Sequence, residues 1–347
     1  MPYTASLDGI RAIAALVIVA YHARIPGLPG GFFGVDVFFV LSGYLVTRLL
    51  AEEHAQSGTI RYRAFMRRRI RRLSPALLTM LAAYLLAAPW LFAEVPFARH
   101  VRDAWWSALY LLNYASAFGE PVAILGNVWS LAVEMQFYLL WPLVLLIVLK
   151  MPRPAALATL AALYLLATAW RAASPEHLGD VWAFYIRTDT HCSGLLLGSF
   201  IGLLNPPAPE RRTAACMAMA GIVILAFALT FYSTKWIVTV QYGFTVAEAA
   251  AALLVVARPS WLGGAVLAWL GRMSYGLYLW HYPIMRALRE QGWENHDWPA
   301  ILAVGGTLGL MCAVASHHWV EGRFYRRGGG WRSCQRRPGS RYREGAA

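Results

Sequence analysis

Charged residues are scarce in this chain, at 14% of its 347 positions. In soluble domains about a quarter of the residues are charged, so the shortage argues against an ordinary water-soluble surface. Hydrophobic residues make up 59% of the chain, and its mean hydropathy is +0.47. Lipid is therefore the expected solvent for most of the chain.

Cysteine is also sparse, with four residues and no CxxC pair. Zinc sites and disulfide frameworks need cysteines that are paired or regularly spaced. The sequence therefore predicts neither of them, and no metal site is expected.

Negative charge is the scarcer sign, which leaves a net charge of +13. The arginines gather between apolar runs and at the C-terminus, which is typical of the cytoplasmic loops of membrane proteins. This distribution argues against a nucleic-acid partner. It favours anionic lipid headgroups and a phosphate-bearing cytosolic ligand.

Apolar runs, in contrast, are abundant and close to the ~20 residues that a helix needs to cross a bilayer of ~30 Å. They predict an all-α, polytopic transmembrane helix bundle with about ten spans in residues 1–322. Residues 323–347 contain eight arginines and are predicted to form a disordered cytoplasmic tail. The spans are expected at about 10–23, 32–50, 75–93, 128–149, 155–170, 183–204, 214–231, 236–257, 266–288 and 299–320.

The segment 104–118 is an eleventh apolar candidate. Counting ten spans keeps the basic loops, such as 61–72 and 150–153, on one side of the membrane, whereas counting eleven scatters them. The positive-inside rule therefore favours ten spans with both termini in the cytoplasm. The segment 104–118 is expected to be an interfacial or re-entrant helix.

The first span carries Asp8, Arg11 and His22, and each charged or imidazole group inside a span is a functional candidate. Eleven residues make close to three helical turns, so Arg11 and His22 share a face and lie ~16 Å apart along the axis. Asp8 is one turn before Arg11 and can pair with it. The alternative is an interfacial ion pair with a histidine that has only a structural role.

Asp36 follows a glycine-rich stretch at the start of the second span. Its carboxylate could accept a hydrogen bond from the ring of His22 and orient it. Equally, it could cap the start of the helix. The residues leave both interpretations open.

Five arginines occupy the six positions 67–72, immediately before the third span. Such a cluster can fix topology, as any basic loop does. It can also bind phosphates through bidentate contacts.

Three further groups of polar residues lie within or beside apolar runs. Glu134 shares a helical face with Ser130 and Tyr138, and a carboxylate in a span is hard to explain by packing. Arg187, Asp189 and His191 cluster at the start of another span, and His281 ends a polar stripe that contains Ser274 and Tyr278. Glu134 is therefore a candidate catalytic residue. The candidates for the acceptor side of a site are Arg187, Asp189, His191 and His281.

Five motifs, in order, resemble the acyltransferase-3 family of bacterial membrane proteins. The likeness covers roughly residues 5–325, and five motifs in sequence are specific. They are Leu7-Asp8-Gly9-Ile10-Arg11-Ala12 with His22 beyond it, Gly34-Val35-Asp36-Val37-Phe38-Phe39-Val40-Leu41-Ser42-Gly43, the arginine block ending Arg72-Leu73-Ser74-Pro75, Trp129-Ser130-Leu131 with Glu134, and Ser274-Tyr275-Gly276-Leu277-Tyr278-Leu279-Trp280-His281.

The resemblance implies about ten membrane helices and the transfer of an acyl group, usually acetyl, from acyl-CoA to a hydroxyl. The implied acceptors are carbohydrates such as lipopolysaccharide O-antigen or exopolysaccharide, or peptidoglycan when a partner domain is present. Essential roles carry over onto Arg11 and His22. Donor binding carries over onto the arginine block, at Arg69 and Arg72.

A mechanism follows as a hypothesis. The nucleotide end of acyl-CoA would bind cytoplasmic Arg68, Arg69 and Arg72 near Arg11. His22 would then act as general base or as a transient acyl carrier, held by Glu134 or Asp36. The acceptor, a carbohydrate or lipid-linked glycan, would approach from the outer side of a bacterial inner membrane. The alternative function is a transporter or flippase of a lipid-linked glycan.

Overall fold

The computed structural model describes residues 3–119, 121–173 and 181–326, and within these ranges the regular structure is entirely helical. Eight segments are long and apolar enough to cross a membrane. They are α1 (Ala5–Ala23), α2 (Gly34–Ser57) with its leading turn, α3 (Tyr62–Leu91), α6 (Trp129–Val148) with its leading turn, α7 (Arg153–Ala173), α11 (Arg211–Phe231), α12 (Phe244–Ala257) with its leading turn, and Asn295–Phe324, which contains α14 (Trp298–Ser316).

The two other predicted spans take different forms. Residues 266–288 lie in α13 (Ala265–Glu290), one continuous helix of 26 residues. Residues 183–204 are instead broken into α8 (Val181–Ile186), α9 (Thr188–His191) and α10 (Ser193–Leu204). The prediction of a polytopic all-α bundle is confirmed, and the chain is a multi-pass membrane protein.

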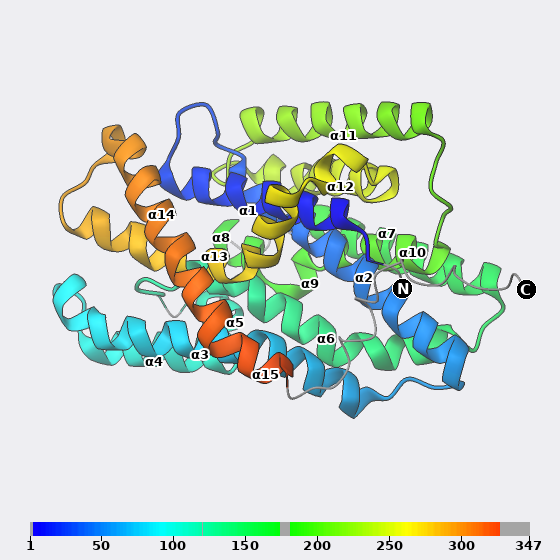
Figure 1. The fold of residues 1–347 in the computed structure, drawn as a ribbon, viewed down its shortest axis with the longest axis horizontal. Helices are drawn as coiled ribbons and strands as arrows, with labels where there is room; N and C mark the ends of the chain where they lie inside the picture. The colour runs from blue at the N-terminus through cyan, green and yellow to red at the C-terminus, as the bar shows by residue number, and fades with distance from the viewer. Residues whose placement is uncertain (1–2, 120, 174–180, 327–347) are drawn as a thin grey trace, which may run out of the picture.

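Residues 104–118 fall in two short helices, α4 (Phe97–Ala108) and α5 (Leu112–Ala117). Figure 1 shows α4 lying beside α3 at one end of the bundle. The predicted tail begins as a short helix, α15 (Gly322–Arg326), and residues 327–347 lie outside the described part of the chain.

The arginine block is not a loop, as the sequence suggested. Helix α3 starts at Tyr62 and continues through Pro75, so positions 67–72 are helical. A proline inside a membrane helix is tolerated because neighbouring groups can satisfy the freed backbone. As a consequence, Arg69 and Arg72 are three residues apart on one face, while Arg68 is turned about 100° away from Arg69.

Glycines allow the helices that carry the site to approach closely. A Cβ atom at Gly271 of α13 would lie 1.9 Å from the backbone oxygen of Asp8 in α1. A Cβ atom at Gly198 of α10 would lie 2.0 Å from the backbone oxygen of Val40 in α2. Small residues at such positions bring membrane helices into backbone contact.

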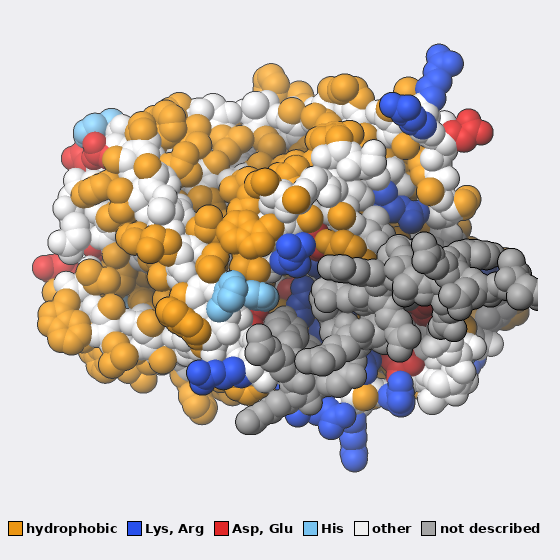
Figure 2. All heavy atoms as spheres, in the orientation of Figure 1, with side chains coloured by type: hydrophobic (Ala, Val, Ile, Leu, Met, Phe, Trp, Pro, Cys, Tyr) orange, Lys and Arg blue, Asp and Glu red, His pale blue; other side chains and the backbone are white. Residues whose placement is uncertain are grey.

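The outward face of the bundle is apolar. Trp90 is 77% exposed and Leu86 is 73% exposed on α3, although both are large hydrophobic side chains. Figure 2 shows hydrophobic side chains spread over the visible face, with most Lys and Arg side chains in the half of the view where α1 and α11 begin. This pattern suits a surface that faces lipid along its flank and water at its ends.

Candidate active site

A pocket with a cavity volume of about 80 Å³ opens among five helices, α1, α2, α3, α6 and α13. Most of its wall is apolar or aromatic, with a small number of charged groups. The charged groups are Arg11, Arg69, Arg72 and Glu134. The full lining is Arg11, Val35, Phe38, Phe39, Ser42, Arg69, Arg72, Leu73, Ser130, Leu131, Glu134, Tyr138, Ser274, Tyr275 and Tyr278.

The structure brings together three arginines that the sequence had assigned to two separate roles. Arg11 comes from α1, whereas Arg69 and Arg72 come from α3. The guanidinium of Arg69 lies over the rings of Phe65 and Tyr138, at 5.2 and 5.1 Å from their centroids. Such stacking holds a guanidinium in place while leaving its edge able to donate hydrogen bonds.

Arg11 also forms the predicted pair with Asp8, with 3.6 Å between Nη1 and Oδ1. Arg68 does not line the pocket. Its side chain is about half exposed and lies 3.3 Å from Glu53, on the face of α3 turned away from Arg69. The assignment of Arg68 to the same binding cluster is therefore not supported by the geometry.

Glu134 lies in the pocket, but it does not hold a histidine. Its carboxylate accepts hydrogen bonds from the hydroxyls of Ser42 and Tyr138. The predicted polar face of α6 is otherwise confirmed, because Ser130 and Tyr138 also line the pocket. The hydroxyls of Ser130 and Tyr278 lie 2.6 Å apart, which joins α6 to α13.

His22 lies near the other end of α1, close to α13. Its Nδ1 atom is 2.8 Å from Nε2 of His281. The ring of Tyr282 packs edge-on against His22, with 4.6 Å between centroids, and Arg289 donates a hydrogen bond of 2.7 Å to the His22 backbone oxygen. His281 therefore belongs with His22 and not with Arg187 and Asp189.

The pocket and the histidine pair are neighbours along α13. Tyr278 lines the pocket, and His281 follows it by almost one helical turn. The two rings are 5.8 Å apart between centroids. Arg11 and the two histidines thus lie along the contact between α1 and α13, and Arg69 and Arg72 reach the same pocket from α3.

Asp36 does not orient His22, which corrects the sequence-based hypothesis. Its Oδ1 atom lies 3.0 Å from Nε2 of His191, and both side chains are fully buried. The reason is the packing of α10 on α2, which brings His191, two residues before α10, beside Asp36. Nδ1 of His191 is 2.6 Å from the backbone oxygen of Tyr185, so His191 is an interior residue and not part of an acceptor surface.

Arg187 and Asp189 pair with each other, at 2.6 Å, and remain partly exposed. Trp170 donates a further hydrogen bond of 3.0 Å to Asp189. Neither residue lines the pocket, so their predicted role toward an acceptor is not linked to it by geometry.

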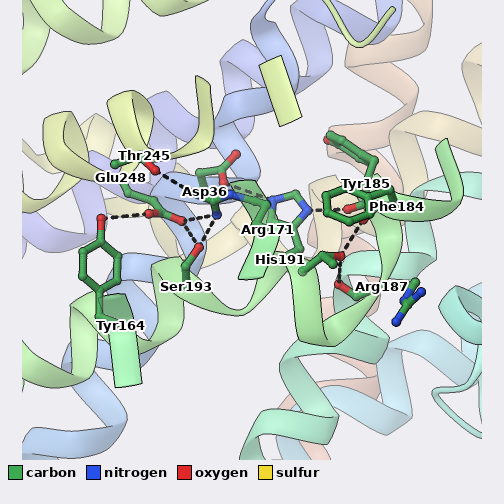
Figure 3. A network of polar contacts seen from close by, with 11 residues as sticks. Asp36, Tyr164, Arg171, Phe184, Tyr185, Arg187, His191, Ser193, Thr245 and Glu248 are labelled. Carbon is green, nitrogen blue, oxygen red and sulfur yellow. Dashed lines mark hydrogen bonds and ion pairs between the residues drawn. The ribbon is translucent and has the colours of Figure 1, made fainter. Parts of the chain in front are cut away.

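Sequence reasoning missed a buried ion pair between α7 and α12. Arg171 and Glu248 are both fully buried, with 3.3 Å between their charged atoms. Figure 3 shows that Ser193 and Thr245 add hydrogen bonds to this pair, close to Asp36 and His191. The signal was present, because Glu248 is a carboxylate within an apolar run, but the predicted span 155–170 ended one residue before Arg171.

No group of three or more metal-ligating side chains occurs in the part of the chain that the structure describes. Comparison with solved structures gives no match.

Comparison with curated proteins gives similar O-acetyltransferases. Peptidoglycan O-acetyltransferase OatA of Listeria monocytogenes is 32% identical over 348 residues, covering 92% of this chain and 55% of that protein. Putative peptidoglycan O-acetyltransferase YrhL of Bacillus subtilis is 34% identical, covering 92% and 54%. O-acetyltransferase OatA of Staphylococcus aureus is 33% identical, covering 92% and 57%. The chain thus spans about half the length of these relatives.

The family model described as an acyltransferase domain matches residues 4–318. The match includes the pocket arginines, Glu134 and the His22–His281 pair, and it confirms the resemblance inferred from the five motifs. The chain belongs to the acyltransferase-3 family.

Proposed function

We propose that the chain is a membrane O-acyltransferase that moves an acyl group, most simply acetyl, from acyl-CoA to a hydroxyl of an envelope carbohydrate. The supporting observations are the pocket that collects Arg11, Arg69 and Arg72 and the His22–His281 pair, whose His281 lies 5.8 Å, between ring centroids, from the pocket residue Tyr278. The names of the relatives, all O-acetyltransferases, support the same reaction class.

The three arginines suit the phosphates of CoA. Guanidinium groups bind phosphate through two parallel, charge-assisted hydrogen bonds. Only one carboxylate, Glu134, lines the pocket against three guanidinium groups, and its hydrogen bonds with Ser42 and Tyr138 keep it in place. The pocket therefore carries a net positive charge, which attracts a polyanionic donor.

The spacing along α1 suits the pantetheine arm. Arg11 and His22 are separated by ~16 Å, because a helix rises 1.5 Å per residue. A donor whose phosphates are held at Arg11, Arg69 and Arg72 would extend past Ser130 and Tyr278 toward the histidine pair. The thioester would then lie near His22.

His22 would act as general base. It accepts the proton of the acceptor hydroxyl as the oxygen attacks the thioester carbonyl, and the carbon–sulfur bond then breaks. The departing CoA thiolate takes the proton from His22, so the products are the ester and free CoA. Attack by His22 itself, with a transient acyl-imidazole, is the second route to the same products.

The acceptor is a carbohydrate hydroxyl. Two of the relatives carry peptidoglycan in their names, which supports peptidoglycan as a candidate acceptor beside O-antigen and exopolysaccharide. The chain would lie in a bacterial inner membrane, with both termini and the arginine end of the pocket in the cytoplasm, where acyl-CoA is made.

The test is to express the chain in a bacterium fed radiolabelled acetate and to measure base-released acetate in peptidoglycan, lipopolysaccharide and exopolysaccharide. Wild type should add ester to one fraction, and His22→Ala should add none while inserting normally. The exposed His318→Ala is the control and should match wild type. Ester formation by His22→Ala would overturn the catalytic assignment. A change in surface glycan without added ester would favour a transporter or flippase.

A further inference from the structure

His281 has two polar neighbours, one at each ring nitrogen. Its Nδ1 atom lies 2.9 Å from the backbone oxygen of Leu277, one turn earlier in α13. Its Nε2 atom lies 2.8 Å from Nδ1 of His22. The ring is fully buried, and Gly309 of α14 leaves little space behind it, since a Cβ there would lie 3.0 Å from the His281 Cα atom.

These contacts determine where the ring protons lie. A backbone oxygen can only accept a hydrogen bond, so Nδ1 of His281 must carry a proton and donate it to Leu277. In a neutral imidazole, Nε2 then has the lone pair and can only accept. Nδ1 of His22 is consequently the donor in the His22–His281 hydrogen bond. The Nε2 atom of His22 is left without a proton.

A protonated, positively charged His281 would reverse the direction of the His22–His281 hydrogen bond. Its Nε2 atom would donate to Nδ1 of His22, and a neutral His22 would then carry its proton on its own Nε2 atom. Among the described residues, the hydrogen bonds and ion pairs include no carboxylate at either ring. The nearest charged contact is Arg289, which is itself a cation. A positive charge on the buried His281 ring would therefore have no anionic partner among these contacts, and burying an unpaired charge costs free energy. The neutral form is therefore the one that fits the site.

We infer that His281 is a positioning residue that holds His22 in the tautomer with Nδ1–H, so that the Nε2 lone pair of His22 is available for catalysis. The inference deepens the proposed function and rests on it for its kinetic consequence, because both the base route and the acyl-carrier route use that lone pair. The relay runs from the Leu277 oxygen through His281 to His22. It joins α13 to α1 through side chains, beyond the Gly271 contact between the same helices.

The direct test is nitrogen NMR of detergent-solubilised protein with ¹⁵N-labelled histidine, which distinguishes protonated from unprotonated ring nitrogens. The His22 resonances are assigned by their loss in His22→Ala. In the wild type, His22 should show a protonated Nδ1 and an unprotonated Nε2, and His281 should show the same pattern. A protonated Nε2 on His22 would overturn the inference, whatever the activity of the protein.

Two substitutions extend the test to kinetics. His281→Gln keeps an acceptor for Nδ1–H of His22, whereas His281→Phe fills a similar volume without one. His281→Phe should lower kcat ~100-fold, within the range that general acid–base catalysis contributes, and leave the KM for acetyl-CoA unchanged. His281→Gln should recover most of that loss. The matched control is His318, an exposed histidine of the next helical segment whose Nδ1 atom also lies 2.9 Å from a carbonyl oxygen one turn earlier. His318→Phe should leave kcat unchanged.

The outcomes separate this inference from the proposed function. Wild-type kcat in His281→Phe, together with an inactive His22→Ala, would overturn the positioning role while leaving His22 catalytic. Full activity in His22→Ala would overturn the catalytic assignment, and the NMR result on the wild type would still decide the tautomer. If His281→Phe fails to fold, the NMR result and His281→Gln remain informative.

Discussion

At the pocket end of α1, the Arg11 guanidinium lies 3.6 Å from the Asp8 carboxylate and faces the cavity that Arg69 and Arg72 also line. A guanidinium can serve a carboxylate and a phosphate at once because its donors point in fixed directions. An ammonium group has no such planar fork. The identity of this side chain, and not only its charge, should therefore matter.

We predict that Arg11→Lys raises the KM for acetyl-CoA ~10-fold or more, since one charge-assisted hydrogen bond contributes ~1.5–3 kcal/mol. Initial rates of ester formation at several donor concentrations measure the effect. Arg212→Lys, at the exposed start of α11, is the control and should match wild type. An unchanged KM in Arg11→Lys would reduce Arg11 to a positional charge.

The buried ion pair Arg171–Glu248 should affect stability and not donor binding, because it joins α7 to α12 and does not line the pocket. Glu248→Ala leaves a guanidinium without its partner, which costs ~3–5 kcal/mol for buried pairs. The unfolding temperature in detergent should therefore fall strongly, and the KM for acetyl-CoA of the folded fraction should not change.

Two variants control that measurement. Glu290→Ala removes a half-exposed pair with Arg286, at 3.1 Å, and should change the unfolding temperature little because surface pairs contribute little. Arg171→Met combined with Glu248→Leu removes both charges and should recover much of the lost stability. An unfolding temperature equal to wild type in Glu248→Ala alone would show that the pair does not stabilise the bundle.

At the scale of elements, the contact between α10 and α2 positions one wall of the pocket. Helix α2 carries Val35, Phe38, Phe39 and Ser42 into that wall. A Cβ atom at Gly198 would lie 2.0 Å from the Val40 oxygen and 2.8 Å from the Tyr44 nitrogen, both of which are backbone atoms of α2. Neither can move without moving the helix.

Gly198→Ala should therefore lower the unfolding temperature, at a cost of at least ~1–3 kcal/mol for an overpacked contact. Gly306→Ala is the matched control in another helix, α14, because its added Cβ would meet only the Val19 Cγ1 atom at 3.8 Å. Alanine favours helix over glycine, so Gly306→Ala should be neutral or slightly stabilising. Equal unfolding temperatures for the two variants would contradict the close packing of α10 on α2.

The same contacts explain what the sequence could and could not predict. Apolar runs predicted the spans because length and composition alone identify a membrane helix. The cost of polar groups in lipid identified Arg11, His22 and Glu134. The partners of these groups depend on which helices are neighbours, which local patterns do not specify. Asp36 was therefore matched to His22, although α10 against α2 brings His191 to it instead.

The prediction that Arg68 binds the donor together with Arg69 and Arg72 lacks support for a related reason. Pro75 was interpreted as the start of a span, but in the structure it lies inside α3. Once that helix is extended back to Tyr62, the helical turn alone separates Arg68 from Arg69 and Arg72. The pocket could not be predicted without that correction, since it needs Arg69 and Arg72 on the face toward α1.

At the scale of the whole molecule, the proposed orientation places the start of α1 and the start of α3 in the cytoplasm. Ser57, at the end of α2, should then be cytoplasmic, and Gln291, after α13, should be outside. Single cysteines at these exposed positions, in a chain otherwise free of cysteine, report the orientation. A membrane-impermeant maleimide added to intact cells should label Gln291→Cys and leave Ser57→Cys unlabelled. The reverse pattern would overturn the orientation and the cytoplasmic donor site with it.

The most direct test is equilibrium binding of CoA to solubilised, folded protein. If Arg69 and Arg72 hold its phosphates, replacing both by Ala should weaken binding ~100-fold or more, at ~1.5–3 kcal/mol for each lost contact. Raised salt should weaken binding to the wild type more than to the double variant, because the lost attraction is Coulombic.

Two exposed neighbours in the same helix provide the control. Arg67→Ala and Arg68→Ala remove the same charge from outside the pocket, so the two together should leave the CoA dissociation constant close to wild type. A large loss in Arg69→Ala/Arg72→Ala with little loss in Arg67→Ala/Arg68→Ala is the predicted result. Wild-type affinity in Arg69→Ala/Arg72→Ala, or an equal loss in both pairs, would contradict the pocket as the donor site.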